Sequence, residues 1–217
     1  MSERYRSLVV AIDGPAGAGK TTLARGLAAA LGIPYLNTGA MYRSLAAEAL
    51  RRGVDPEDGA ALAGLADSMR FSIEGDPASL RVEGKPPGDD LATAEVEAVV
   101  STVAGHPEVR AVLRAEQRRL GAGGAVVEGR DIGTVVFPDA DLKIFLEADP
   151  EERAARRQLE RRQGDPALAE ALERRDARDA RTNPLVPAMD ALVVDSTGRD
   201  AEEILAEVVT LVPRRDA

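Results

Sequence analysis

Short apolar runs alternate with longer segments of helical composition along the 217-residue chain. Because these runs are largely apolar and the first is continuous, they predict strands that are buried on both faces, as in a parallel sheet. The predicted strands are 8–12, 33–36, 125–127, 142–146 and 191–194. The clearest predicted helices are 20–31, 40–52 and 201–211. This order predicts an α/β fold with a mostly parallel five-stranded sheet.

One interval, residues 66–122, breaks this rhythm. Residues 70–74 and 79–83 alternate polar and apolar positions around a Gly-Asp-Pro turn, which predicts a hairpin with one solvated face. Helical segments follow the hairpin. We therefore expect the interval to be an insertion that projects from the main sheet, while 1–65 and 123–217 form the core.

Composition narrows the classes of function. The formal net charge is −9, so a basic surface for long nucleic acids is not expected. The chain has no cysteine and a single histidine, His106, which excludes disulfides, thiolate nucleophiles and multi-histidine metal clusters. No apolar run approaches the roughly 20 residues of a membrane helix, and the N-terminus lacks a signal-peptide pattern. We expect a cytoplasmic protein that binds neither nucleic acid nor membrane.

The first predicted strand ends in a glycine-rich segment that matches G-x-x-x-x-G-K-[ST] in full. The motif lies between a strand and a helix, where backbone N–H groups and a helix N-terminus can surround phosphate groups. Lys20 is expected to reach the β- and γ-phosphates, and the Thr21 hydroxyl to hold Mg²⁺. The residues expected to bind the nucleotide are Gly14, Pro15, Ala16, Gly17, Ala18, Gly19, Lys20, Thr21 and Thr22.

A P-loop alone does not name the reaction. The N-K-x-D segment with which regulatory GTPases read guanine does not occur in the chain, and motor or transporter ATPases normally need more residues. A kinase for a small molecule is the favoured class. The alternatives are a regulator that hydrolyses or merely holds ATP and, among kinases, an acceptor such as AMP, UMP, thymidylate or shikimate.

Two charged segments follow predicted strands, at the edge where ligands of open α/β sheets bind. Residues 37–43 open the second helix, and Arg43 lies one turn into it, able to fork onto a phosphate. Residues 128–134 read Glu-Gly-Arg-Asp-Ile-Gly-Thr, which places two charges between glycines after a buried strand. Such charges are poor core residues, so we expect Arg130 and Asp131 to belong to a site.

These segments carry a resemblance to a known family. Similarity to the bacterial cytidylate kinases, which are nucleoside monophosphate kinases, is found in residues 12–20, 38–43, 128–140, 175–179 and 184–192. The matching blocks run from the first predicted strand to the last. Asn37 departs from the family pattern, in which an acidic residue is common at this position.

The resemblance implies a three-layer P-loop fold with a nucleoside-binding insertion and a short arginine-rich lid at 150–180. It also implies transfer of a phosphoryl group from ATP to CMP or dCMP. The residues that it assigns to the acceptor site are Thr38, Tyr42, Arg43, Ser101, Arg110, Gly129, Arg130, Asp131, Arg175, Asp179 and Arg181. Within this set, Ser101, Arg110, Asp131 and Arg181 would lie near the base. Arg43 and Arg130 would hold the phosphate, and Arg175 with Asp179 the sugar.

The residues suit the chemistry of such a transfer. The nucleophile is a phosphate oxygen that is already largely dianionic at pH 7, so no catalytic base is required. Bringing two anions together does require cations. We expect Lys20 and Arg130 to supply charge within the site. Arg153 and Arg157, four residues apart on one helix face, are expected to supply it from the lid. The whole chain, 1–217, is expected to act as one domain and as a monomer.

Overall fold

The computed structural model of the chain describes residues 5, 7–75, 77–88, 91, 93–162 and 186–213, with 157–162 described as backbone only. The described strands are β1 (Val9–Asp13), β2 (Tyr35–Asn37), β3 (Phe71–Glu74), β4 (Ser79–Val82), β5 (Ala125–Glu128), β6 (Leu142–Glu147) and β7 (Leu192–Asp195). They form one sheet in the order β3-β4-β2-β5-β1-β6-β7. All neighbours pair in parallel except β3 and β4, so the fold is α/β with a mostly parallel sheet.

The sheet has seven strands rather than the predicted five. All five predicted strands are present and run parallel, and the difference is the hairpin β3–β4. We expected this hairpin to project from the sheet, but β4 pairs with β2 through Tyr35 and Ser79. The Tyr35 N–H also donates to the Ala78 carbonyl at 3.0 Å. The hairpin therefore covers the backbone edge that β2 would otherwise leave unpaired.

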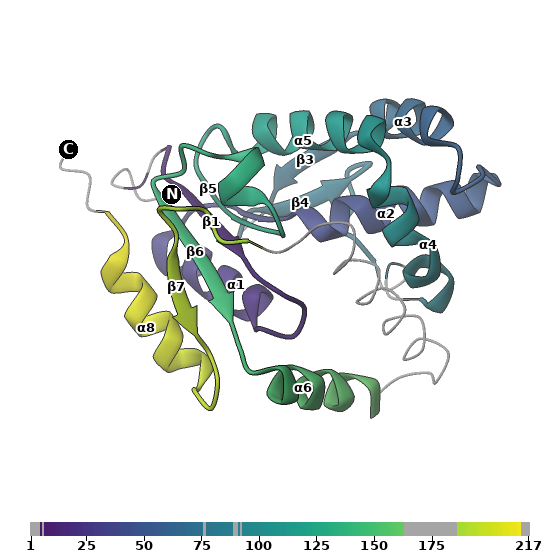
Figure 1. Cartoon of the computed structure of the whole chain (residues 1–217). Coiled ribbons are helices and arrows are strands. Elements are labelled where there is room, and N and C mark those ends of the chain that lie inside the picture. Colours follow the sequence, from purple (N-terminus) through teal and green to yellow (C-terminus); the bar gives the residue numbers. More distant parts are fainter. Residues whose placement is uncertain are drawn as a thin grey trace.

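Helices cover both faces of the sheet (Figure 1). The described helices are α1 (Lys20–Leu31), α2 (Thr38–Arg52), α3 (Gly59–Ser68), α4 (Ala94–Gly105), α5 (Pro107–Gly121), α6 (Pro150–Arg162) and α8 (Ala201–Leu211). The helices α1 and α8 pack on one face, and α2 to α5 pack on the other. No helix in this described part of the chain is both long and apolar enough to cross a bilayer.

Two helix boundaries have clear local causes. The helix α2 begins two residues before its predicted start because the Asn37 side chain accepts a hydrogen bond from the Ala40 N–H at 2.9 Å, which caps it. Both α1 and α2 end where predicted, and each is followed by a glycine, Gly32 and Gly53. These adopt φ values of 66° and 68°, the left-handed conformation that ends helices.

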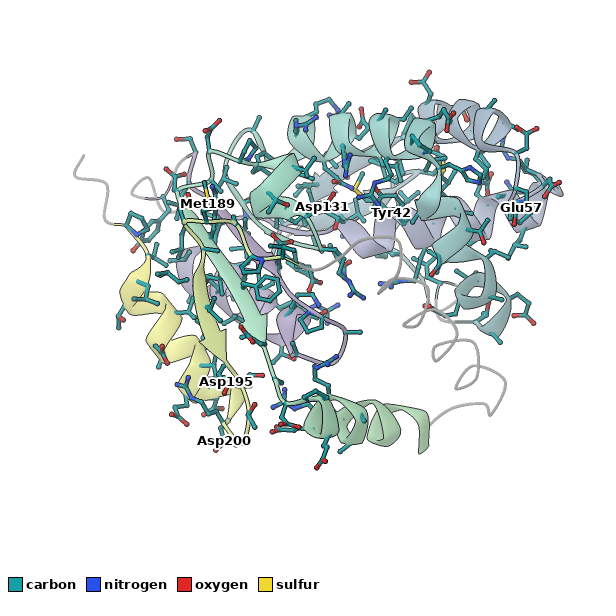
Figure 2. All side chains as sticks on the ribbon, viewed as in Figure 1. Tyr42, Glu57, Asp131, Met189, Asp195 and Asp200 are labelled. Atoms are coloured by element: carbon teal, nitrogen blue, oxygen red, sulfur yellow. The ribbon has the colours of Figure 1, made fainter. Side chains whose placement is uncertain are left out.

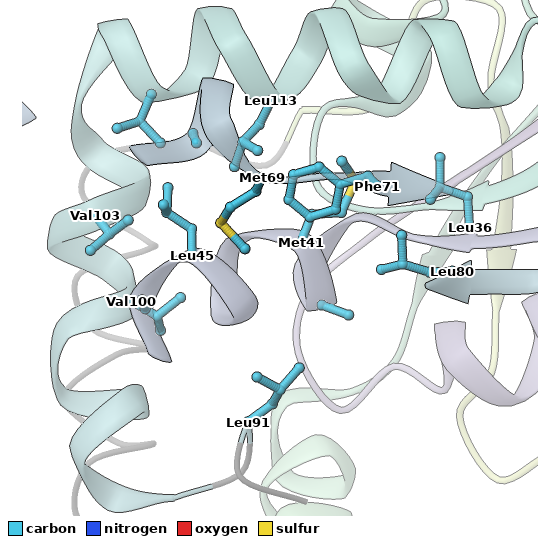
Figure 3. Packing of buried hydrophobic residues seen from close by; sticks show 14 of the residues in the cluster. Leu36, Met41, Leu45, Met69, Phe71, Leu80, Leu91, Val100, Val103 and Leu113 are labelled. Atoms are coloured by element: carbon cyan, nitrogen blue, oxygen red, sulfur yellow. The ribbon is translucent and has the colours of Figure 1, made fainter. Parts of the chain in front are cut away.

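The core is split by the sheet into two apolar clusters. Along β1, Val10 and Ile12 face the cluster under α1 and α8, while Ala11 faces the cluster under α2 to α5. Figure 3 shows the second cluster, in which Phe71 and Leu80 of the hairpin pack beside Met41 of α2. Continuous apolar strands are needed because both faces are covered.

Candidate active site

The carboxyl ends of β1, β2 and β5 lie level with one another. In the strand register Glu128 pairs with both Ile12 and Asn37. Three connections therefore begin at one edge of the sheet: the loop before α1, the start of α2, and the loop from β5 to the π-helical turn η3 (Ile132–Val136). This is the edge at which open α/β sheets bind ligands.

The loop before α1 has a backbone that requires glycine. Gly14, Gly17 and Gly19 adopt φ values of 145°, 77° and 90°. A Cβ atom on Gly14 would lie 2.1 Å from the Leu146 carbonyl oxygen, so no larger residue fits there. The chain then enters α1 at Lys20, whose ammonium donates to the Pro15 carbonyl at 2.7 Å. This curled loop at a helix N-terminus is a phosphate-binding geometry.

Glu128 joins the phosphate loop to the start of α2. Its buried carboxylate accepts hydrogen bonds from the Thr21 hydroxyl, at 3.1 and 3.0 Å to its two oxygens, and from the Tyr35 hydroxyl. Its main-chain carbonyl accepts from the Thr38 hydroxyl at 2.7 Å. One residue thus contacts both Thr21, in the first turn of α1, and Thr38, the first residue of α2.

Tyr35 is held in place from both sides. Burial and the adjacent Glu128 charge raise the pKa of the Tyr35 hydroxyl well above its usual value, so it remains a hydrogen-bond donor at neutral pH. The Arg25 guanidinium lies over its ring, 5.7 Å from the ring centre. Tyr35 therefore orients the Glu128 carboxylate toward Thr21.

Asp13, at the end of β1, fixes the position of η3. Its two carboxylate oxygens accept hydrogen bonds from the backbone N–H groups of Ile132 and Gly133, at 2.8 and 2.7 Å. Burial raises the pKa of Asp13, although these two N–H donors act in the opposite direction. The loop that carries Arg130 and Asp131 is thereby tied to the end of the phosphate-loop strand.

Asp131 lies beneath α5 together with Tyr42 (Figure 2). Its Oδ2 atom accepts from Arg110 at 2.9 Å and from Arg114 at 2.5 Å. Burial raises the pKa of Tyr42, and the charges that act on its hydroxyl are those of Arg110, Asp131 and Arg114. The structure thus brings together three predicted acceptor residues: Tyr42, Arg110 and Asp131.

Four further predicted acceptor residues, Thr38, Arg43, Gly129 and Arg130, belong to α2 or to the loop after β5. Thr38 and Gly129 are in close contact, since a Cβ atom on Gly129 would lie 2.7 Å from the Thr38 hydroxyl oxygen. The Arg43 guanidinium folds back over Gly39, 3.6 Å from where a Cβ atom would stand. Ser101 is a half-buried residue of α4, and Arg130 a half-buried residue of the loop after β5.

The helix α6 approaches the phosphate loop with its first two arginines. Arg153 donates to the Ala148 carbonyl at 3.1 Å and reaches the Ala16 carbonyl at 3.5 Å. Arg156 reaches the Gly17 carbonyl at 3.4 Å and is held by Glu152 and Ser196. The predicted lid side chain Arg157 lies outside the described residues. The same holds for Arg175, Asp179 and Arg181.

Four residues at the candidate site were not predicted from the sequence as site residues. Arg114, Arg156 and Ser196 each contact a predicted site residue or the phosphate loop, and Tyr35 contacts Glu128. A signal existed for Arg114, because it follows Arg110 by four positions and shares its helix face. Ser196, whose hydroxyl donates to the Ala18 carbonyl at 3.1 Å, follows the last strand and gave no such signal.

A glycine-shaped loop between β1 and α1 of a parallel sheet is the defining feature of P-loop nucleotide-binding proteins, and this chain has it. Comparison with known proteins narrows the class. The model of the cytidylate kinase family matches residues 10–214. The chain therefore belongs to the cytidylate kinase family.

Relatives support this assignment along the full chain. A cytidylate kinase from Streptomyces griseus is 46% identical over 214 residues, covering 95% of this chain and 93% of the relative. One from Desulfitobacterium hafniense is 44% identical, with coverage of 95% and 93%. One from Geobacter sulfurreducens is 42% identical, with coverage of 97% and 95%. The similarity is thus not confined to the P-loop.

Proposed function

We propose that this chain transfers the γ-phosphoryl group of ATP to CMP or dCMP, giving ADP and CDP or dCDP. Membership of the cytidylate kinase family supports the reaction. One structural observation carries it. Glu128 contacts the P-loop through its carboxylate and the acceptor-side helix through its carbonyl, so a phosphate donor and a phosphate acceptor would meet beside one residue.

The donor is held by the loop from Gly14 to Thr22. Its glycines turn backbone N–H groups toward the polyphosphate, and the N-terminus of α1 adds about half a unit of positive charge. Lys20 starts that helix and neutralises charge on the β- and γ-phosphates. Because these contacts come from the main chain, they depend on backbone shape more than on side-chain identity.

The residues beside the loop suit Mg²⁺. The Thr21 hydroxyl and the Glu128 carboxylate lie within 3.1 Å of each other and are the oxygen donors that Mg²⁺ prefers. Mg²⁺ usually keeps several waters and takes one or two protein oxygens besides the phosphates, so a larger acidic cluster is not needed. When bound, the ion neutralises charge on the phosphates, with Thr21 as the proposed ligand and Glu128 orienting its hydroxyl.

The acceptor is proposed to bind between α2, α5 and the loop after β5. Arg43 and Arg130 hold its phosphate, with Thr38, Tyr42 and Gly129 shaping the site around it. Ser101, Arg110 and Asp131 read the base. Arg175 and Asp179 are assigned to the sugar and Arg181 to the base on the family resemblance alone, since they lie outside the described residues.

The transfer itself requires positioning and charge. A dianionic phosphate oxygen of the acceptor attacks the γ-phosphorus, and the bond to the oxygen bridging the β- and γ-phosphates breaks. Lys20 and Arg130 offset the charge that gathers at the transferring group, and Arg153 and Arg157 add to this from α6. Closure of the region 150–180 over the group would exclude water and so suppress hydrolysis.

The proposal includes an organisation of the chain. Residues 1–65 and 123–217 form the catalytic core, 66–122 the nucleoside-binding insertion, and 150–180 the lid. The protein acts as a monomer, in the cytoplasm, where its nucleotide substrates are found.

An acceptor survey tests the proposal. The protein is supplied with ATP, Mg²⁺ and each nucleoside monophosphate in turn, and ADP formation is measured. We expect the fastest turnover with CMP or dCMP. Fastest turnover with AMP would overturn the cytosine assignment. ATP hydrolysis that is indifferent to every acceptor would overturn the kinase assignment.

A further inference from the structure

The helix α5 presents two arginines to one carboxylate. Arg110 and Arg114 lie one turn apart on the same face, and each donates through Nη2 to the same oxygen of Asp131, Oδ2. The three side chains are only 22%, 24% and 18% exposed, so water screens this cluster weakly. Arginine and carboxylate usually pair through two parallel hydrogen bonds, and neither arginine does so here.

The cluster has one positive charge more than its carboxylate can balance. It also has spare hydrogen-bond donors. Within the described residues, the Arg114 Nε–H and the Gln117 amide nitrogen are buried and have no acceptor. Gln117 lies one turn further along α5 and beside the Tyr42 hydroxyl. Because buried donors and unbalanced charge are costly, such a group favours a ligand that presents hydrogen-bond acceptors.

We propose that Arg114 is a positioning residue that sets the base preference of the acceptor site by keeping Arg110 from pairing fully with Asp131. This inference rests on the proposed function. Since Arg114 shares Oδ2, Arg110 makes a single contact with the carboxylate and braces its other Nη atom on the Ala104 carbonyl, 3.3 Å away. Without Arg114, Asp131 could close on Arg110 as a two-bond pair and withdraw its donors.

The chemistry of the pyrimidines makes this arrangement selective. The pairing edge of cytosine presents two adjacent acceptors, O2 and N3, followed by an amino donor. In uracil N3 carries a proton and is a donor, and the exocyclic oxygen O4 is an acceptor. Donor and acceptor are therefore exchanged at these two positions, while O2 remains an acceptor. A guanidinium with free N–H groups beside a carboxylate complements cytosine and opposes uracil. The carboxylate must also stay oriented, and the hydrogen bond from Arg114 to Oδ2 is the second effect of that arginine.

The test compares Arg114→Leu with a matched change on the same helix. Arg119→Leu removes an arginine of α5 that is 57% exposed and whose partners are Glu116 and the Phe71 carbonyl rather than Asp131. We expect Arg114→Leu to raise the KM for CMP about tenfold, the size of a lost charge-assisted hydrogen bond, and to change kcat much less. The ratio of kcat/KM for CMP to that for UMP should fall by a similar factor. Arg119→Leu should leave both values unchanged.

Two further measurements separate the outcomes. Arg114→Lys keeps a cation near Asp131 and should restore part of the CMP preference, and it replaces the leucine variant if that variant unfolds below the assay temperature. An unchanged CMP to UMP ratio in a folded Arg114 variant overturns the inference, as does an equal change in Arg119→Leu. Failure of the unmodified protein to phosphorylate CMP would instead overturn the proposed function.

Discussion

The proposed donor side and the proposed acceptor side of the site are built in opposite ways. The donor side is a run of consecutive residues, 14–21, shaped by glycines with positive φ. The acceptor side draws on α2, α5 and the loop after β5, and its contacts are between charged side chains such as Arg110 and Asp131. A substitution on the donor side should therefore disturb the backbone, and one on the acceptor side should alter the chemistry while leaving the fold intact.

The largest expected effect is on the donor side, in Gly14→Ala. The added Cβ would stand 2.1 Å from a backbone oxygen of β6, which cannot move without disturbing the sheet. We expect the free energy of unfolding to fall by roughly 3 kcal/mol or more, with loss of ATP binding. Urea denaturation and ATP titration measure the two effects.

Gly53→Ala is the matched control for this change. Gly53 also has a positive φ, 68°, but a Cβ there meets nothing within 4 Å. In Gly53→Ala the free energy of unfolding should fall only by the strain of a left-handed alanine, about 1–2 kcal/mol. This variant should bind ATP normally. Equal losses in the two variants would show that close approach to β6 is not what makes Gly14 necessary.

The second-largest expected effect is on the proposed acceptor side and concerns the variant Arg130→Ala. Removing this cation should lower turnover at least about a hundredfold, because charge compensation in the transition state is lost. Thermal stability should barely change. Arg51→Ala, which removes a 68% exposed arginine paired with Glu48 on α2, serves as the control. Near-normal turnover in Arg130→Ala would exclude this residue from the reaction, and a large loss of stability would contradict the contrast between the two sides.

The smallest effect concerns a support behind the acceptor loop, in Asp190→Asn. The buried Lys143 packs against Gly133 of η3 and donates to both Asp190 oxygens at 2.8 Å. This hydrogen bond lowers the pKa of Asp190. The stability that it contributes is therefore present above the ordinary aspartate pKa and is lost as pH falls through the lowered value.

Unfolding of the unmodified protein and of Asp190→Asn is compared across that pH range. The difference between their free energies of unfolding should be largest at neutral pH and should vanish in acid. The loss caused by Gly14→Ala, which has no titrating group, should persist at every pH. A gap for Asp190→Asn that does not change with pH would show that charge does not support this loop.

Much of the fold could be predicted because its signals are local. Each predicted parallel strand is present within a residue or two, since a buried run such as that of β1 can be recognised without knowing its neighbours. The docking of the hairpin on β2 could not be predicted, because alternation indicates a hairpin but not the edge that it joins. The helix α3, rich in alanine and containing two glycines, and the π-helical turn η3 have no distinctive periodicity.

The site divides along the same line. The curled loop of the P-loop could be predicted because Gly14, Gly17 and Gly19, the residues that adopt positive φ, stand close together in the sequence. The role of Glu128 as a link from Thr21 to Thr38 depends on three strands lying level, which only the register reveals. The pairing of Arg114 with Asp131 spans 17 positions and two elements, and it was visible in the sequence only as a spacing of four from Arg110.

The placement of two tyrosines makes the molecule its own optical probe. The chain has no tryptophan and three tyrosines, so its near-ultraviolet emission comes from phenol rings alone. Tyr35 stands against Glu128 beside the proposed nucleotide site, and Tyr42 stands beside Asp131 in the proposed acceptor site. With Tyr5 replaced by phenylalanine as a common background, replacing one of the pair as well leaves the other to report, so the arrival of each substrate can be followed separately and without an attached dye.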